Sequence, residues 1–199
     1  MEPNILLTPL PESVFVDGEE YFINADFRVG IMFEKILADN SKSSQEKVTE
    51  WFSLYYVSSV PTDAKKAADA IINFYSCGVK NTNTTKRKMN GNIEIKPRLI
   101  YSYEHDASYI FGAFLSQYGI DLNDIEFLHW WKFQALFKSL HSSNKIVEIM
   151  GYRSADLSKI TNKKERERIA RLKEVYAIPE NLTHEEKVAR AGAAFGGFM

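Results

Sequence analysis

Apolar and polar residues near the N-terminus are arranged as two short strands around a tight turn. Residues 14–16 and 21–23 are apolar runs that flank Asp17-Gly18. The Asp-Gly pair favours a two-residue hairpin loop, because both central residues of that loop take positive φ angles. A loop of this length pairs Val14 with Tyr21 across the hairpin. Two strands alone are only marginally stable in water, so we expect this hairpin to pack on helices.

Beyond residue 25 the apolar positions repeat with the 3.6-residue period of amphipathic α-helices. This spacing predicts helices over residues 26–38, 43–60, 62–78, 106–119, 143–151 and 161–176. Capping residues support several of these boundaries. Asp26 and Thr62 are predicted N-caps, and Ser43 with Glu46 forms a predicted capping box. Gly78 stands where a residue of left-handed conformation ends a helix.

The pattern over residues 124–140 predicts a helix that is apolar on almost every side, with a capping box at Asn123 and Glu126. Its aromatic side chains are Phe127, Trp130, Trp131, Phe133 and Phe137. A helix of this kind is surrounded on most sides by its own fold or by a partner. Aromatic side chains dominate both cores and interface anchors, so these five residues are candidate core or interaction anchors.

Residues 79–98 lack hydrophobic periodicity and carry six basic side chains against one acidic side chain. Lys86, Arg87 and Lys88 form a candidate basic patch that is able to contact phosphates. A solvated, solubilising loop is the interpretation we favour, because the chain as a whole is nearly neutral, at −1. Contact with nucleic acid through this loop stays open as the alternative.

Together these elements predict a mainly α protein, a helical bundle with an N-terminal β-hairpin. We expect a single domain over residues 1–178, with the hairpin at 12–24 and a flexible basic loop at 79–98. Residues 179–199 are expected to form a C-terminal extension with a short helix and a frayed tail.

The composition of the chain indicates its cellular compartment better than it indicates any catalytic activity. The chain of 199 residues contains 13 Phe, 10 Tyr and 3 Trp, a large amount of apolar surface to bury for a net charge of −1. A single cysteine, Cys77, excludes an intrachain disulfide. No stretch approaches the roughly 18 unbroken apolar residues of a membrane span, and the N-terminus does not resemble a signal peptide. We therefore expect a cytoplasmic protein without membrane association.

The sequence contains none of the common motifs of catalytic or nucleotide-binding sites. There is no phosphate-binding glycine loop, no dinucleotide-binding motif and no nucleophile elbow. Glu104-His105-Asp106 is the one compact ionisable cluster, and we favour Asp106 as a helix cap with an exposed His105 over a metal or general-base site. His129 is interpreted as a hydrogen-bonded interior histidine. We expect no catalytic, cofactor-binding or metal site, and no enzyme activity.

Several segments nevertheless resemble one known family, the bacteriophage "gene product fifteen" family of tailed phages and prophages of Gram-positive bacteria. The matching segments are Pro9–Val14 with Val16–Tyr21, Ile72–Gly78, the longest run from Asp106 through Leu122, His129–Phe133, Met150–Arg153 and Asp156–Ile160. The resemblance covers most of the chain, apart from the basic loop and the residues after Pro179.

This resemblance implies a role in tail morphogenesis. The family's genes lie near the tape-measure gene, a position typical of tail assembly chaperones, which are mainly helical and self-associate. We therefore expect a non-enzymatic chaperone in the cytoplasm of the bacterial host, with the tape-measure protein, other tail proteins and further copies of itself as partners. The alternatives are a phage protein that contacts nucleic acid through residues 79–98 and a minor structural tail component. No active-site residue is implied.

Overall fold

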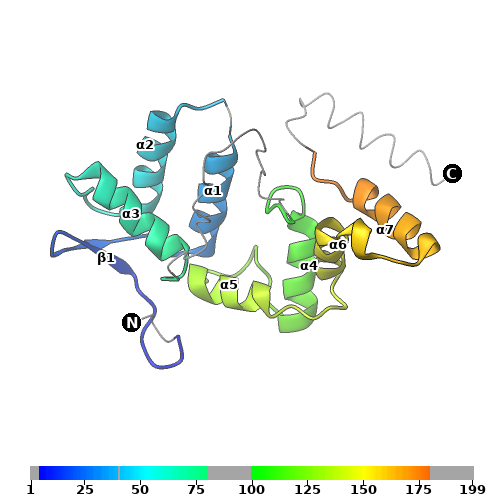
Figure 1. Ribbon diagram of the computed structural model, residues 1–199. Helices are drawn as coiled ribbons and strands as arrows, with labels where there is room; N and C mark the ends of the chain where they lie inside the picture. Colours follow the sequence, from blue (N-terminus) through cyan, green and yellow to red (C-terminus); the bar gives the residue numbers. More distant parts are fainter. Residues whose placement is uncertain (1–4, 40, 80–99, 180–199) are drawn as a thin grey trace. The chain divides into compact units, whose positions relative to one another are not determined.

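A computed structural model describes residues 5–39, 41–79 and 100–179 of the chain, and within them the fold is mainly α (Figure 1). The strands are β1 (Ser13–Val16) and β2 (Glu19–Phe22). The helices are α1 (Phe27–Ala38), α2 (Ser44–Tyr55), α3 (Ala64–Tyr75), α4 (Ala107–Tyr118), α5 (Trp130–Lys138), α6 (Lys145–Ser154) and α7 (Lys163–Val175), with a 3₁₀ turn, η1, at Leu157–Lys159. The predicted fold class, mainly helical with an N-terminal hairpin, is confirmed.

The chain forms two compact units. Of the described residues, 5–39, 41–79 and 114–140 belong to unit 1, and 100–113 and 141–179 belong to unit 2. The boundary falls inside α4, whose last turns belong to unit 1. The single domain expected over residues 1–178 stays a prediction. The candidate basic patch of Lys86, Arg87 and Lys88 and the expected tail at 180–199 lie outside the described residues.

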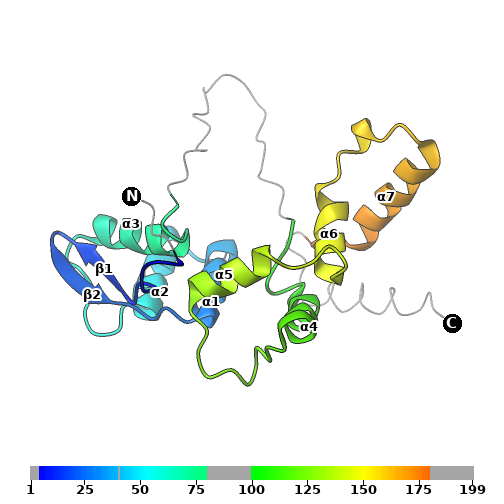
Figure 2. The ribbon, with the colours of Figure 1, turned by 90° about the horizontal axis from the view of Figure 1, so that it is seen from below.

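The hairpin has the register expected from its two-residue turn. Val14 pairs with Tyr21 in an antiparallel ladder, and Asp17 and Gly18 take positive φ angles of 54° and 86°. Lys66 of α3 forms an ion pair with Asp17 of this turn, with Nζ 2.5 Å from Oδ1. The hairpin packs on α3, as its small size requires (Figure 2).

Helix boundaries in unit 1 follow local capping chemistry. The Asp26 carboxylate accepts the Arg28 backbone N–H at the start of α1, and the predicted capping box of Ser43 and Glu46 is formed at the start of α2. The prediction for α3 was wrong by one residue, because Asp63 and not Thr62 accepts the first N–H groups of that helix. At the other end of α3, Gly78 has the expected positive φ of 71°.

The core of unit 1 is aromatic. In this unit α1 packs on α2 and α5, and α2 packs on α3 (Figures 1 and 2). Phe133 lies at one centre and stacks with Phe27 and Phe114 at ring distances of 5.1 and 5.0 Å. Phe33 lies at a second centre, against Trp51 and Tyr75, among others. Rings of this size supply the large apolar area that stabilises a small unit.

Unit 2 is built on α4, α6 and α7, with Ile110, Ile146 and Ile149 buried among its apolar side chains. Helices α6 and α7 pack directly on each other (Figure 2). Asp106 is 1% exposed and its carboxylate binds the buried Arg153 guanidinium. Asp106 precedes α4 as predicted, but its side chain acts in this ion pair. His105 beside it is exposed, as expected.

Candidate interaction surface

The predicted aromatic helix is shorter than its sequence pattern suggested. Helix α5 begins at Trp130, and His129 is its N-cap, with Nδ1 accepting the Trp131 backbone N–H at 3.0 Å. Residues 124–129 are not helical. The expected capping box at Asn123 is absent from these described residues, where Asp121 instead accepts the Asn123 N–H. The prediction of a helix over residues 124–140 was therefore wrong for its first third.

The start of α1 holds residues 122–129 in their non-helical path. Arg28 donates from Nη2 to the carbonyl oxygens of Leu122 and Ile125, at 3.2 and 2.7 Å. The Leu128 N–H donates to the Asp26 carboxylate, and the Leu128 carbonyl accepts the Phe27 N–H. These bonds use backbone groups that a helix would need for itself. Contacts with a segment about a hundred residues away thus override the local helical pattern.

Two neighbouring tryptophans of α5 close the end of α3. The Trp130 indole donates to the Tyr75 carbonyl and the Trp131 indole donates to the Phe74 carbonyl, each at 2.8 Å. The last carbonyl groups of a helix lack the usual i+4 partners, and these bonds supply indole donors to two of them. The Phe74 carbonyl also accepts the Cys77 backbone N–H at 2.9 Å. Gly30 of α1 makes room for the Trp130 ring, which a Cβ at that position would overlap.

The five candidate anchors therefore divide into two groups. Trp130, Trp131, Phe133 and Phe137 are at most 7% exposed and belong to the core of unit 1. Phe127 is 49% exposed and lies in the non-helical segment ahead of α5. Phe127 is exposed because residues 122–129 bind to the start of α1 in a non-helical conformation.

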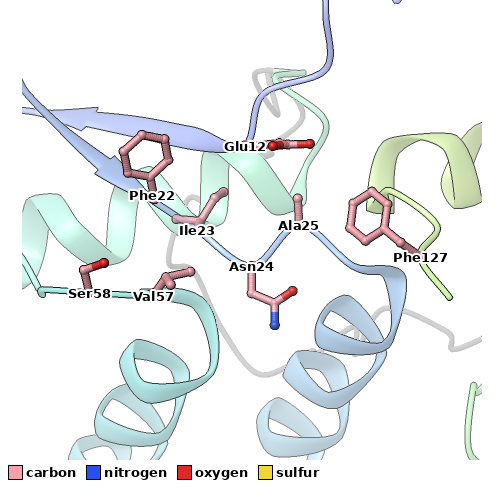
Figure 3. A pocket seen from close by; sticks show the side chains of 8 residues that line it. All are labelled: Glu12, Phe22, Ile23, Asn24, Ala25, Val57, Ser58 and Phe127. Atoms are coloured by element: carbon pink, nitrogen blue, oxygen red, sulfur yellow. The ribbon is translucent and has the colours of Figure 1, made fainter.

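Phe127 lines a pocket of about 540 Å³ in unit 1 (Figure 3). The other lining residues are Glu12, Phe22, Ile23, Asn24, Ala25, Val57 and Ser58. They come from the chain before β1, the end of β2 with its connection to α1, and the residues that follow α2. Backbone bonds join the last two segments, since the Val57 N–H donates to the Phe22 carbonyl at 3.2 Å.

Apolar side chains continue from the pocket onto the hairpin. The register places Phe15 and Phe22 on the same face, because Phe15 is opposite Glu20 and Phe22 is opposite Ser13. Phe15 and Phe22 are 69% and 59% exposed. We call Phe15, Phe22, Val57 and Phe127 with the pocket the hairpin–Phe127 surface. The hairpin part of this surface was not predicted from the sequence, although apolar residues on both faces of a short hairpin were a signal for it.

The segments that carry this surface are rich in carboxylates. Residues 12–24 and 121–129 contain Glu12, Asp17, Glu19, Glu20, Asp121, Asp124 and Glu126, and neither range contains Lys or Arg. Asp17 is paired with Lys66, whereas Glu19 and Glu20 accept hydrogen bonds from the uncharged hydroxyls of Tyr21 and Ser13. Of these, Glu12 lines the pocket and Glu20 lies on the hairpin face of Phe15 and Phe22, so carboxylates lie beside the exposed phenylalanines.

The titratable groups considered from the sequence take structural positions. His129 is 3% exposed, its Nε2 lies 3.0 Å from the Pro11 carbonyl, and burial lowers its pKa. Burial raises the pKa of the Cys77 thiol, which disfavours the reactive thiolate. Within the described ranges no group of three or more His, Cys, Asp or Glu side chains is placed to hold a metal ion. No helix of that same part of the chain is long and apolar enough to cross a bilayer.

Comparison with known families agrees with the resemblance in the sequence. The model of the bacteriophage Gp15 protein family matches residues 6–178, which is most of the chain. The protein belongs to this family. The match spans most of both units and includes every residue of the hairpin–Phe127 surface. No curated protein and no solved structure matches the chain.

Proposed function

We propose that this Gp15 family member is a phage tail assembly chaperone that binds the tape-measure protein in the cytoplasm of the host. Family membership supports a role in phage morphogenesis. The observation that carries the finer proposal is the hairpin–Phe127 surface, where large apolar side chains lie exposed around a pocket. Exposed apolar patches of this kind are typical of protein-binding sites. A chaperone in this role requires no catalytic step.

Binding would cover apolar segments of the client before tube proteins polymerise around it. A single pocket of about 540 Å³ accepts one or two large side chains and not a whole helix. Affinity for a long client would therefore come from many copies of the chaperone, each at its own segment. Self-association of the chaperone would raise this multivalent affinity further.

Co-expression with the tape-measure protein of the same phage tests the proposal. We expect the client to become soluble and to co-purify with this chain, and to aggregate when the chain is omitted. A client whose solubility does not change, with nothing co-purifying, would overturn the proposal. The matched control is a variant with Phe22→Ala and Phe127→Ala, which removes two exposed rings and leaves the aromatic core intact.

Two further measurements separate the alternatives. Mass spectrometry of purified virions that finds this chain in stoichiometric amounts would favour a minor structural tail component. A salt-dependent shift of DNA that disappears when Lys86, Arg87 and Lys88 are neutralised would favour contact with nucleic acid. The chaperone proposal expects neither result.

A further inference from the structure

We infer that the hairpin–Phe127 surface selects apolar segments that carry Lys or Arg beside their apolar side chains. This inference rests on the proposed function, because it states which part of a client the chaperone would bind. It goes beyond that function in naming the docking site and the charge of its partner.

The apolar half of the recognition lies in three exposed side chains around the pocket. Phe22, Val57 and Phe127 are 59%, 64% and 49% exposed, and they come from three separate segments of unit 1. Hydrogen bonds fix all three segments. The Val57 N–H donates to the Phe22 carbonyl of β2, and the Arg28 side chain donates to the carbonyls of Leu122 and Ile125. The surface is therefore formed before a partner arrives, which lowers the entropy cost of binding.

The acidic half of the recognition comes from the same segments. Glu12 lines the pocket, Glu20 shares the hairpin face of Phe15 and Phe22, and Glu126 directly precedes Phe127. Lys132 acts electrostatically on His129, whose ring lies 6.4 Å from that of Phe127. Two other basic side chains of this unit are engaged. Lys66 pairs with Asp17, and Arg28 binds Asp26 and two backbone carbonyls.

Charge of one sign around an apolar pocket gives specificity. A Lys or Arg next to an inserted apolar side chain gains Coulomb energy at the partly desolvated rim, whereas Glu or Asp at that position is repelled. An acidic rim also reduces self-association of the exposed phenylalanines, because two copies would bring like charges together. The surface therefore favours a basic apolar segment over a second hairpin–Phe127 surface.

Two synthetic peptides of equal length test the charge preference with the full-length chain. Both contain the same Leu and Phe positions, and one has Lys where the other has Glu. We expect fluorescence anisotropy at low salt to show the Lys peptide binding at least about tenfold more tightly. The difference should shrink at about 1 M salt, where exposed charges more than about 3 Å apart are largely screened from each other. Equal affinities at low salt would overturn the inference.

Variants locate the site. Phe22→Ala with Phe127→Ala should weaken binding of the Lys peptide at least about tenfold, because anchor residues dominate interface energy. Val175→Ala is the matched control, since Val175 is 69% exposed in unit 2. Glu12→Gln with Glu126→Gln should remove the preference for Lys, and Glu167→Gln on α7 serves as its control. Circular dichroism checks that every variant is folded, and unchanged binding in a folded Phe variant would overturn the location.

The outcomes also separate this inference from the proposed function. If the tape-measure protein co-purifies equally well with wild type and with the Phe variant, the chaperone function stands and the docking site is wrong. If the Lys peptide binds through Phe22 and Phe127 while no tape-measure protein co-purifies, the docking site stands and the client is wrong.

Discussion

Asp106 and Arg153 form a two-point ion pair inside unit 2. Arg153 Nη1 lies 2.6 Å from one carboxylate oxygen of Asp106, and Nη2 lies 2.9 Å from the other. Both side chains are at most 5% exposed. The same guanidinium donates to the carbonyl oxygens of Tyr176 and Ile100, so one side chain ties together the segment before α4, helix α6 and the end of α7.

Replacing Arg153 by Met should therefore destabilise unit 2 strongly. Removing one partner of a buried ion pair leaves the other charge buried alone, at a cost of about 3–5 kcal/mol. Urea denaturation followed by circular dichroism measures the loss. Arg168→Gln, which breaks an exposed pair with Glu165, is the control and should leave the midpoint unchanged. Similar midpoints for both variants would contradict the structural role of Arg153.

Gly30 should not tolerate alanine. A Cβ at this position overlaps the ring of Trp130, which is 1% exposed and held by its bond to Tyr75. We expect a loss of about 1–3 kcal/mol, the usual cost of overpacking a core. Gly151→Ala is the matched control, because nothing lies within 4 Å of its Cβ and alanine favours a helix by about 0.5–1 kcal/mol. The urea midpoints should therefore move in opposite directions.

Alanine substitutions at Phe133 and Phe127 should lower the stability of the protein by different amounts, because the two rings differ in burial. Phe133→Ala removes a fully buried ring from the centre of unit 1 and should cost about 3–5 kcal/mol. Phe127→Ala truncates an exposed side chain and should change stability by less than about 0.5 kcal/mol. Chemical denaturation monitored by tryptophan fluorescence measures both. A large loss for Phe127→Ala would show that this residue belongs to the core.

His129 should make stability fall in mild acid. Burial lowers the pKa of this histidine, although the Pro11 carbonyl and Glu12 oppose the shift and Lys132 adds to it. The unfolded chain binds the proton more readily, so stability is complete above about pH 6.5 and decreases as pH falls below that value. His129→Asn keeps an N-cap acceptor but cannot titrate. Denaturation midpoints between about pH 7.5 and 5.5 should fall more steeply for wild type than for this variant.

Glu34 should give stability the opposite pH dependence, with a loss as pH rises. Burial raises the pKa of its carboxyl, partly offset by a hydrogen bond from the Tyr75 hydroxyl. The contribution of Glu34 to stability is thus present below its ordinary pKa of 4.5 and is lost as pH rises through the raised value. Glu34→Gln should be more stable than wild type at about pH 7 and equal to it near pH 4. An unchanged difference across this range would contradict the shift.

The hairpin and most helix boundaries are predictable because their causes are local. The Asp-Gly turn selects the register of β1 and β2, and the Ser43–Glu46 capping box starts α2 whatever the rest of the chain does. Likewise, the 3.6-residue period identifies the positions of α1 and α3, since it reports a face that has to be buried. The choice between Thr62 and Asp63 as a cap depended on detail that spacing does not contain, and so did the end of α2 at Tyr55 instead of just before Pro61.

Other features depend on partners that are distant in sequence. Asp106 and Arg153 are 47 positions apart. The local sequence around one of them does not predict the other as its partner. The hairpin–Phe127 surface combines three segments, and exposure of a phenylalanine in an apolar pattern becomes visible only when its neighbours are in place. The pattern over residues 124–140 even favoured the wrong structure locally.

Local patterns therefore set the fold class, the hairpin register and the family of this protein, because each is encoded in neighbouring residues or in short motifs. Tertiary contacts decided the surface through which we propose it acts. Arg28 and Asp26 took the backbone groups of residues 122–128 and ended the aromatic helix at Trp130. Hydrogen bonds to a distant helix start outweighed a weak local helical preference, and they left Phe127 outside the core.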